Sequence, residues 1–208
     1  MLPVTGYEDF RGKFERVADL RQLFVFILFD EPGKKIVANF VDDNFDWLDR
    51  LAAASNVFGF AFVHRDHESE MVANPSLQVA ELFGIRPREL PGVVVFSMLP
   101  DGEQVADAAF LPLEKQLFES DLRALESFFA DLFSIIQDAQ DSVGDGESAL
   151  EAFRKCIHAE ERERRWGNVQ EYIRARLQDI ASMPSTFIDS MAQAFAKEAT
   201  LRMMGPGG

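Results

Sequence analysis

Apolar residues along the chain alternate between short continuous runs, typical of strands, and stripes at helical spacing. Residues 23–29 are apolar without interruption, which predicts a strand buried on both faces. A second run, residues 57–63, places its three phenylalanines on one face, because strand side chains alternate. Two further strands are predicted over 93–96 and 104–110. The Pro-Asp-Gly turn between them favours an antiparallel hairpin.

Helical stripes separate these strands and dominate the rest of the chain. Residues 35–40 fit either an extension of the helix predicted over residues 40–54 or a short strand. In the helix predicted over residues 121–138, Phe128 and Ile135 widen the apolar stripe. We therefore expect this helix to contact both the sheet and another surface. Beyond this helix only helices are predicted. The predicted helices cover residues 6–20, 40–54, 74–83, 121–138, about 148–180 and about 184–203.

A polar stretch rich in small residues divides the predicted elements into two groups. Residues 139–148 read Ala-Gln-Asp-Ser-Val-Gly-Asp-Gly-Glu-Ser, which is typical of a linker. The predicted fold class is therefore α/β, with a sheet flanked by helices over residues 1–138. An all-helical C-terminal extension follows over residues 149–208.

Composition and charge exclude several classes of protein. Of the 208 residues 47% are hydrophobic, and twenty are phenylalanine, which excludes disorder and predicts a large core. The densest apolar run is far shorter than the ~20 residues of a membrane helix, so no membrane span is expected. The net charge of −14 comes mostly from residues 1–140, which hold 12 basic and 24 acidic residues. Such an acidic surface repels phosphate and anionic lipid, so neither nucleic acid nor membrane is an expected partner.

One stretch of sequence is similar to thioredoxins. Residues 79–86 read Val-Ala-Glu-Leu-Phe-Gly-Ile-Arg, residues 90–96 read Leu-Pro-Gly-Val-Val-Val-Phe, and Gly102 follows. Thioredoxins have a similar helix ending, a loop, a cis-proline, an apolar strand and a glycine turn. The resemblance covers roughly residues 20–138, with a specific part of about 25 residues, and bears on fold more than on activity. It implies a thioredoxin-like sheet.

The resemblance also implies a cis peptide at Leu90–Pro91, with an ordinary trans turn as the alternative. The sequence departs from the thioredoxin pattern at two places. The loop over residues 86–91 is longer than in thioredoxins, and Gly92 occupies the place where they usually carry threonine.

The cysteine content excludes the usual chemistry of that family. Thiol–disulfide exchange needs a low-pKa thiolate at a helix start, normally with a resolving cysteine three positions later. After the first strand, residues 30–35 read Asp-Glu-Pro-Gly-Lys-Lys. The single cysteine, Cys156, is flanked by Phe153 and Ile157, which predicts a small core residue. We therefore expect a redox-inactive domain without a CxxC motif or a disulfide.

Two polar clusters could hold a divalent metal but fit simpler interpretations better. Residues 64–68, His-Arg-Asp-His-Glu, follow the second strand and are typical of a polar loop. Asp42, Asp46 and Asp49 line one side of a predicted helix and are typical of a solvated face. Phosphate-binding glycine motifs and the Gly-x-Ser-x-Gly turn are absent from the sequence. No cofactor and no metal site are predicted.

The layout also resembles redox-inactive members of the protein disulfide isomerase family, in which a thioredoxin-like domain precedes a helical one. This resemblance implies a chaperone-like or adaptor-like module. Its partner would be a peptide or protein, bound at the loop edge around Leu90, Pro91 and Gly92. With no leader or retention signal in the sequence we expect the cytoplasm. The secretory pathway or ER lumen is the alternative if a leader has been removed.

Two other functions stay open. The first is a glutathione-linked transferase or lyase, in which a hydroxyl replaces the thiol; Ser97, Ser120 and Tyr7 are its candidates. The second is a structural subunit of an assembly, or a homodimer, suggested by the wide apolar face of the helix over residues 121–138.

Overall fold

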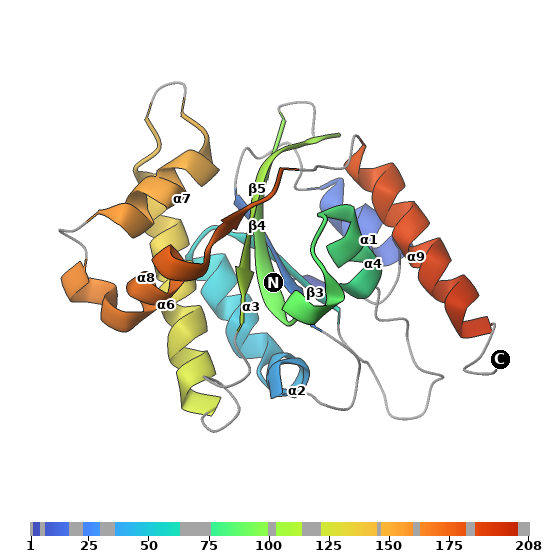
Figure 1. Ribbon diagram of the computed structural model, residues 1–208, viewed down its shortest axis with the longest axis horizontal. Coiled ribbons are helices and arrows are strands. Elements are labelled where there is room, and N and C mark those ends of the chain that lie inside the picture. Colours follow the sequence, from blue (N-terminus) through green and yellow to red (C-terminus); the bar gives the residue numbers. More distant parts are fainter. Residues whose placement is uncertain are drawn as a thin grey trace.

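A computed structural model describes residues 2–4, 7–16, 23–29, 36–62, 76–99, 103–113, 122–144, 147–159, 163–181 and 186–203. The described strands form one mixed sheet in the order β1-β3-β2-β4-β5-β6 (Figure 1). Neighbours among β1, β3 and β2 run parallel, whereas β4 is antiparallel to β2, β5 to β4, and β6 to β5. The strands are β1 (Leu2–Val4), β2 (Leu23–Leu28), β3 (Phe58–Phe62), β4 (Gly92–Met98), β5 (Val105–Pro112) and β6 (Gln178–Asp179).

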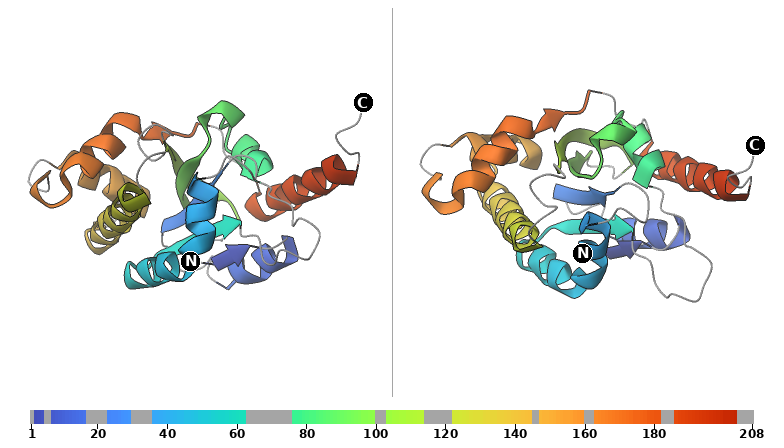
Figure 2. Two further views of the ribbon diagram at one scale, coloured as in Figure 1. Left: turned by 90° about the horizontal axis from the view of Figure 1, so that it is seen from below. Right: turned by 60° about the horizontal axis from the view of Figure 1, so that its bottom comes forward.

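Helices cover both faces of this sheet. Figure 1 and both views of Figure 2 place α6, α7 and α8 on one side of the molecule and α9 on the other. Contacts pair α9 with α1 and α4, and pair α6 with α2, α3, α7 and α8. The described α-helices are α1 (Tyr7–Phe14), α2 (Ile36–Asp43), α3 (Phe45–Ala54), α4 (Ser76–Leu82), α6 (Leu122–Asp141), α7 (Ala149–His158), α8 (Glu163–Arg176) and α9 (Phe187–Met203).

One face of the sheet carries a cluster of phenylalanines. The register aligns Phe24 with Phe58 and Phe96, so alternate residues of three strands share this face. Rings from α1 and α9, and that of Phe83 just after α4, pack onto it, with Phe187 of α9 at 5.2 Å from Phe96 between centroids. Each fully buried phenylalanine contributes about 1.5–3 kcal/mol, so this cluster is a major source of stability.

The opposite face is covered by α3, α7 and α8, which contact β3, β4 and β5, and α6 packs against these three helices. The broad apolar stripe of α6 is fully used within the chain: Phe128 and Ile135 are both buried. The Phe128 ring meets Tyr172 of α8 edge-on at 5.9 Å. On the sheet side, Gln140 of α6 accepts a hydrogen bond from Leu23 N–H of β2, and the second surface is the chain's own α7 and α8. The prediction that this helix contacts both the sheet and another surface is confirmed in this form.

The pattern located most elements correctly, with three corrections. The helix predicted over residues 40–54 is two helices, α2 and α3, and residues 36–40 are helical. The break lies at Asn44, whose backbone and side-chain amides both donate to the carbonyl of Phe40. The helix predicted over 148–180 is α7, α8 and the two-residue strand β6, so the C-terminal part is not purely helical. The strand β1 was not predicted at all.

The C-terminal third packs against the rest of the molecule on both faces. The helix α7 contacts β4, strand β6 pairs with β5, and α9 reaches α1 and α4 on the other face. The chain therefore crosses the edge of the sheet at β6. The division into domains at residues 138 and 148 stays a prediction, although α6 continues through the first three residues of the predicted linker.

Candidate functional site

The proline segment before β4 is the predicted partner-binding edge. The Leu90–Pro91 peptide is cis, as the resemblance implied. A 3₁₀ turn over Pro87–Glu89 leads into it, and Leu90 N–H donates to the carbonyl of Pro87. The carbonyl of Pro91 accepts from Leu113 N–H at 2.8 Å. Leu90, Pro91 and Gly92 are all buried, so these three residues lie beneath the surface of the edge rather than on it.

Gly92 is required by the packing of β5 against β4. A Cβ at position 92 would lie 2.3 and 2.4 Å from two ring carbons of Phe110 and 2.9 Å from the carbonyl oxygen of Leu111. The departure from the thioredoxin threonine therefore has a local cause, since the Phe110 ring occupies the space that a side chain at position 92 would need.

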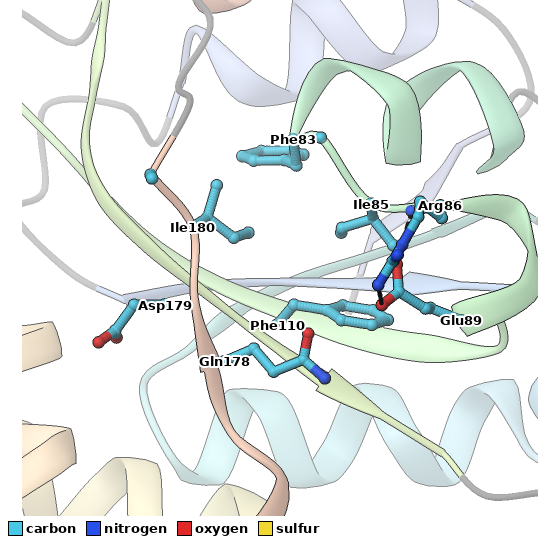
Figure 3. A pocket seen from close by; sticks show the side chains of 10 residues that line it. Phe83, Ile85, Arg86, Glu89, Phe110, Gln178, Asp179 and Ile180 are labelled. Atoms are coloured by element: carbon cyan, nitrogen blue, oxygen red, sulfur yellow. Dashed lines mark hydrogen bonds and ion pairs between the residues drawn. The ribbon is translucent and has the colours of Figure 1, made fainter.

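A hollow of about 300 Å³ lies beside this segment (Figure 3). The end of α4 and the turn that follows it form one wall, and β6 with the residues after it forms the other. Phe110 lies between the two walls (Figure 3). We use "the hollow" for the space lined principally by Phe83, Ile85, Arg86, Phe110, Gln178 and Ile180. Its volume is at the lower end of the range for small-ligand sites, which suits a single side chain or a small molecule.

The wall after α4 is held by an ion pair. Glu89 accepts from the Arg86 backbone N–H at 2.9 Å and from its guanidinium at 2.8 and 3.0 Å. These hydrogen bonds lower the pKa of Glu89 to about 2. Gly84, with φ of 66°, makes the turn that ends α4. The wall is thus a short, internally bonded connection.

The opposite wall is tied to the back of the sheet by Arg154 of α7. Its guanidinium bonds Asp107 of β5, with a second contact at 3.1 Å, and reaches Asp179 of β6 at 2.7 Å. These contacts raise the pKa of Arg154, chiefly through the hydrogen bond to Asp107. We call these three residues the Arg154 cluster. It carries one positive and two negative charges, and its most exposed member is Asp179.

The hydroxyls considered for glutathione chemistry are not brought together. Ser97 is buried in β4 in register with Leu23, which places it on the face opposite the phenylalanine cluster. Tyr7 of α1 lies on the phenylalanine face, 5.9 Å from the ring of Phe195. Ser120 lies outside the described residues. Ser97 and Tyr7 therefore lie on opposite faces of the sheet.

The residues considered as metal ligands are spread over two helices or lie outside the described residues. Asp42 is on α2 while Asp46 and Asp49 are on α3, and residues 64–68 lie outside the described residues. Across the described ranges, no three His, Cys, Asp or Glu side chains gather closely enough to hold a metal ion.

Cys156 is buried in α7, as predicted. Its neighbours on the helix, Phe153 and Ile157, are buried as well, and its sulfur lies 3.9 Å from the Ser142 hydroxyl. This helix packs on α6, on the face of the sheet opposite the phenylalanine cluster. The thiol is therefore a core side chain rather than part of the hollow.

Sequence reasoning missed half of the hollow. The wall after α4 falls in the stretch that resembles thioredoxins. The other wall falls in the Leu-Gln-Asp-Ile segment, residues 177–180, which reads as the end of a helix. A strand of two exposed residues has no periodicity of its own, so only its pairing with β5 reveals it.

No family model, curated protein or solved structure matches the chain. Among the helices that the structure describes, none is both long enough and apolar enough to cross a bilayer.

Proposed function

We propose that the chain is a binding module for a peptide or protein partner, built on a thioredoxin-like scaffold without thiol chemistry. The observation that carries this proposal is the strand order: β1-β3-β2-β4-β5, with three parallel strands, then an antiparallel pair preceded by Pro91. The antiparallel pair and the cis-proline before β4 agree with what the sequence resemblance implied, and they support the proposal.

The cysteine content supports the part of the proposal that concerns thiol chemistry. The chain holds one cysteine, and a dithiol exchange cycle needs two. That cysteine is buried in α7. The hollow beside the proline segment supports a binding function. Its lining combines apolar and polar residues, which is typical of recognition sites. The region around Leu90, Pro91 and Gly92 supports one wall of this proposed surface.

Reduction of insulin by dithiothreitol tests both halves of the proposal in one assay. The free B chain aggregates, so a thiol–disulfide catalyst shortens the lag before turbidity. A protein that binds extended polypeptide lengthens that lag. We expect this chain to lengthen the lag in a dose-dependent manner, and the Cys156→Ala variant to act equally well.

A thioredoxin serves as the positive control for acceleration, and an inert protein of similar acidity controls for crowding and charge. Shortening of the lag by the wild-type chain would contradict redox inactivity. No change in lag at a molar excess of the chain would contradict binding of extended polypeptide.

A further inference from the structure

The two walls of the hollow come from segments almost a hundred residues apart. We propose that the hollow receives one apolar side chain of an extended peptide, and that Asp179 binds a Lys or Arg beside it in the same peptide. This inference rests on the proposed function, and it names the surface and the chemistry of the partner.

The size and lining of the hollow set the first requirement. Phe83, Ile85, Phe110 and Ile180 supply apolar surface, and each is at most 8% exposed, so the accessible apolar area is small. About 300 Å³ is enough for one aliphatic or aromatic side chain and too little for a large cofactor. A single apolar anchor is therefore the occupant that fits.

The polar groups at the rim set the second requirement. Arg86 and Glu89 pair with each other, and the exposed Arg88 adds a positive charge to that wall, so any excess negative charge comes from the other wall. Gln178 of β6 is exposed, and its register partner is Phe110, so its amide stands at the mouth of the hollow (Figure 3). An amide at this place can bond a peptide group of an extended chain in either direction.

The charge of the partner follows from the Arg154 cluster. One guanidinium serves two carboxylates, which leaves one negative charge in excess. The Asp179 side chain is 75% exposed, against 32% for Asp107 and 26% for Arg154. Figure 3 shows the Asp179 carboxylate on the outer side of β6, away from the hollow. A peptide that crosses β6 therefore presents a neighbouring residue to this carboxylate, and the net charge of −14 favours a cationic one.

The arrangement also explains why the C-terminal segment crosses the sheet edge where it does. Without β6 and the two residues after it, Ile180 and Ala181, the hollow has one wall. The proposed surface is thus made jointly by the predicted α/β domain and the predicted extension.

A set of nine peptides tests the proposal. Each has the sequence Gly-Ser-X-Z-X-Ser-Gly with a fluorescent label; X is Lys, Ser or Glu, and Z is Phe, Leu or Ser. Binding to the full chain is measured by fluorescence polarisation. We expect the peptides with Phe or Leu between lysines to bind most tightly, and those with Ser at Z to bind at least about tenfold more weakly.

Four variants locate the contact. Ala181→Trp and Gln178→Trp place an indole at the hollow and should weaken every Phe peptide by about tenfold or more. Ala54→Trp adds the same indole at an exposed position on α3, on the other face, and should change nothing. Asp179→Asn should reduce the preference for Lys over Ser about two- to fivefold and leave the preference for Phe over Ser unchanged.

Each outcome bears on a definite claim. If Phe peptides bind and neither indole at the hollow weakens them, the hollow is not the site, and the proposed binding function survives. If no peptide binds while the lag of insulin aggregation still lengthens, this inference fails alone. If neither effect occurs, both proposals fail.

Discussion

Gly92 and Phe110 show how one residue fixes the shape of this region. The Phe110 ring lies where any side chain at position 92 would stand, so β4 and β5 approach closely at the base of the hollow. Phe110 is also 1% exposed, so the ring has no free space into which it can move. The identity of residue 92 is therefore a consequence of packing rather than of backbone conformation.

Gly92→Ala should destabilise the protein by about 1–3 kcal/mol, because overpacking at this position displaces a fully buried ring. Gly12→Ala is the matched control: no atom lies within 4 Å of the added Cβ, and α1 should gain about 0.5–1 kcal/mol. Urea unfolding of the two variants measures both changes. A Gly92→Ala variant as stable as the wild type would show that the ring does not occupy this space.

The Arg86–Glu89 pair makes the free energy of unfolding depend on pH. Because the pKa of Glu89 in the folded protein is about 2, below its ordinary 4.5, the pair stabilises the folded state above pH 4.5. That contribution is lost as the pH falls from about 4.5 to about 2. Glu89→Gln should therefore be less stable than the wild type at pH 7, and the difference should shrink towards pH 2.

Solvent exposure of the pair keeps this difference small, so the titration of the carboxyl itself is the sharper measurement. A ¹³C NMR titration should give a pKa for Glu89 far below 4.5 in the wild type, returning towards that value in Arg86→Met. An unchanged pKa in Arg86→Met would contradict the assigned cause.

At the scale of elements, the two-residue strand β6 is held by contacts from β5 and from α7. It pairs with β5, and Ile180 N–H donates to the carbonyl of Ala108 at 3.0 Å. From the back, Arg154 of α7 binds Asp179. A strand this short gains little from its own ladder, so side-chain contacts decide whether it stays paired.

Arg154→Met should loosen β6 and destabilise the protein by about 1–2 kcal/mol, between the values typical of exposed and of buried pairs. The removal leaves Asp107 and Asp179 without their shared cation. Lys155→Met removes the neighbouring cation, whose side chain is 67% exposed and pairs with Glu147, and should cost less than about 1 kcal/mol. Faster hydrogen exchange at the Ile180 amide in Arg154→Met alone is the expected sign, and equal exchange in both variants would contradict it.

At the scale of the whole molecule, the C-terminal third completes the core rather than adding a separate body. Phe187 of α9 contacts the rings of Phe10, Phe14, Phe83 and Phe96, which belong to three different elements or their ends. On the other face α7 and α8 cover the apolar stripe of α6. Both faces of the sheet therefore depend on residues after 148.

Truncation after residue 148 should leave a chain without a cooperative unfolding transition. The phenylalanine cluster loses the whole of α9, and the stripe of α6 loses its cover, so large apolar surface is exposed. Strong binding of the dye ANS and loss of near-ultraviolet circular dichroism are the expected results. A sharp, two-state unfolding transition in the truncated chain would instead support an independent domain over residues 1–138.

Sequence patterns predicted the strands β2 to β5 and most helices, because long apolar runs and wide stripes reflect burial directly. Phe128 and Ile135 also indicated that α6 packs against a second surface besides the sheet. The patterns failed where pairing outweighs local preference, as at the strand β1 and at Gln178 and Asp179. The hollow escaped prediction for the same reason, since one of its walls exists only through long-range contacts.

The most direct test of binding without thiol chemistry is a map of where a peptide contacts the chain. Titration of ¹⁵N-labelled protein with Gly-Ser-Lys-Phe-Lys-Ser-Gly should give saturable shifts of amide signals. The account predicts that these shifts centre on residues 83–92 and 178–181, and that Cys156→Ala leaves them unchanged. Saturable shifts confined to other residues, or no saturable shift at all, would contradict it.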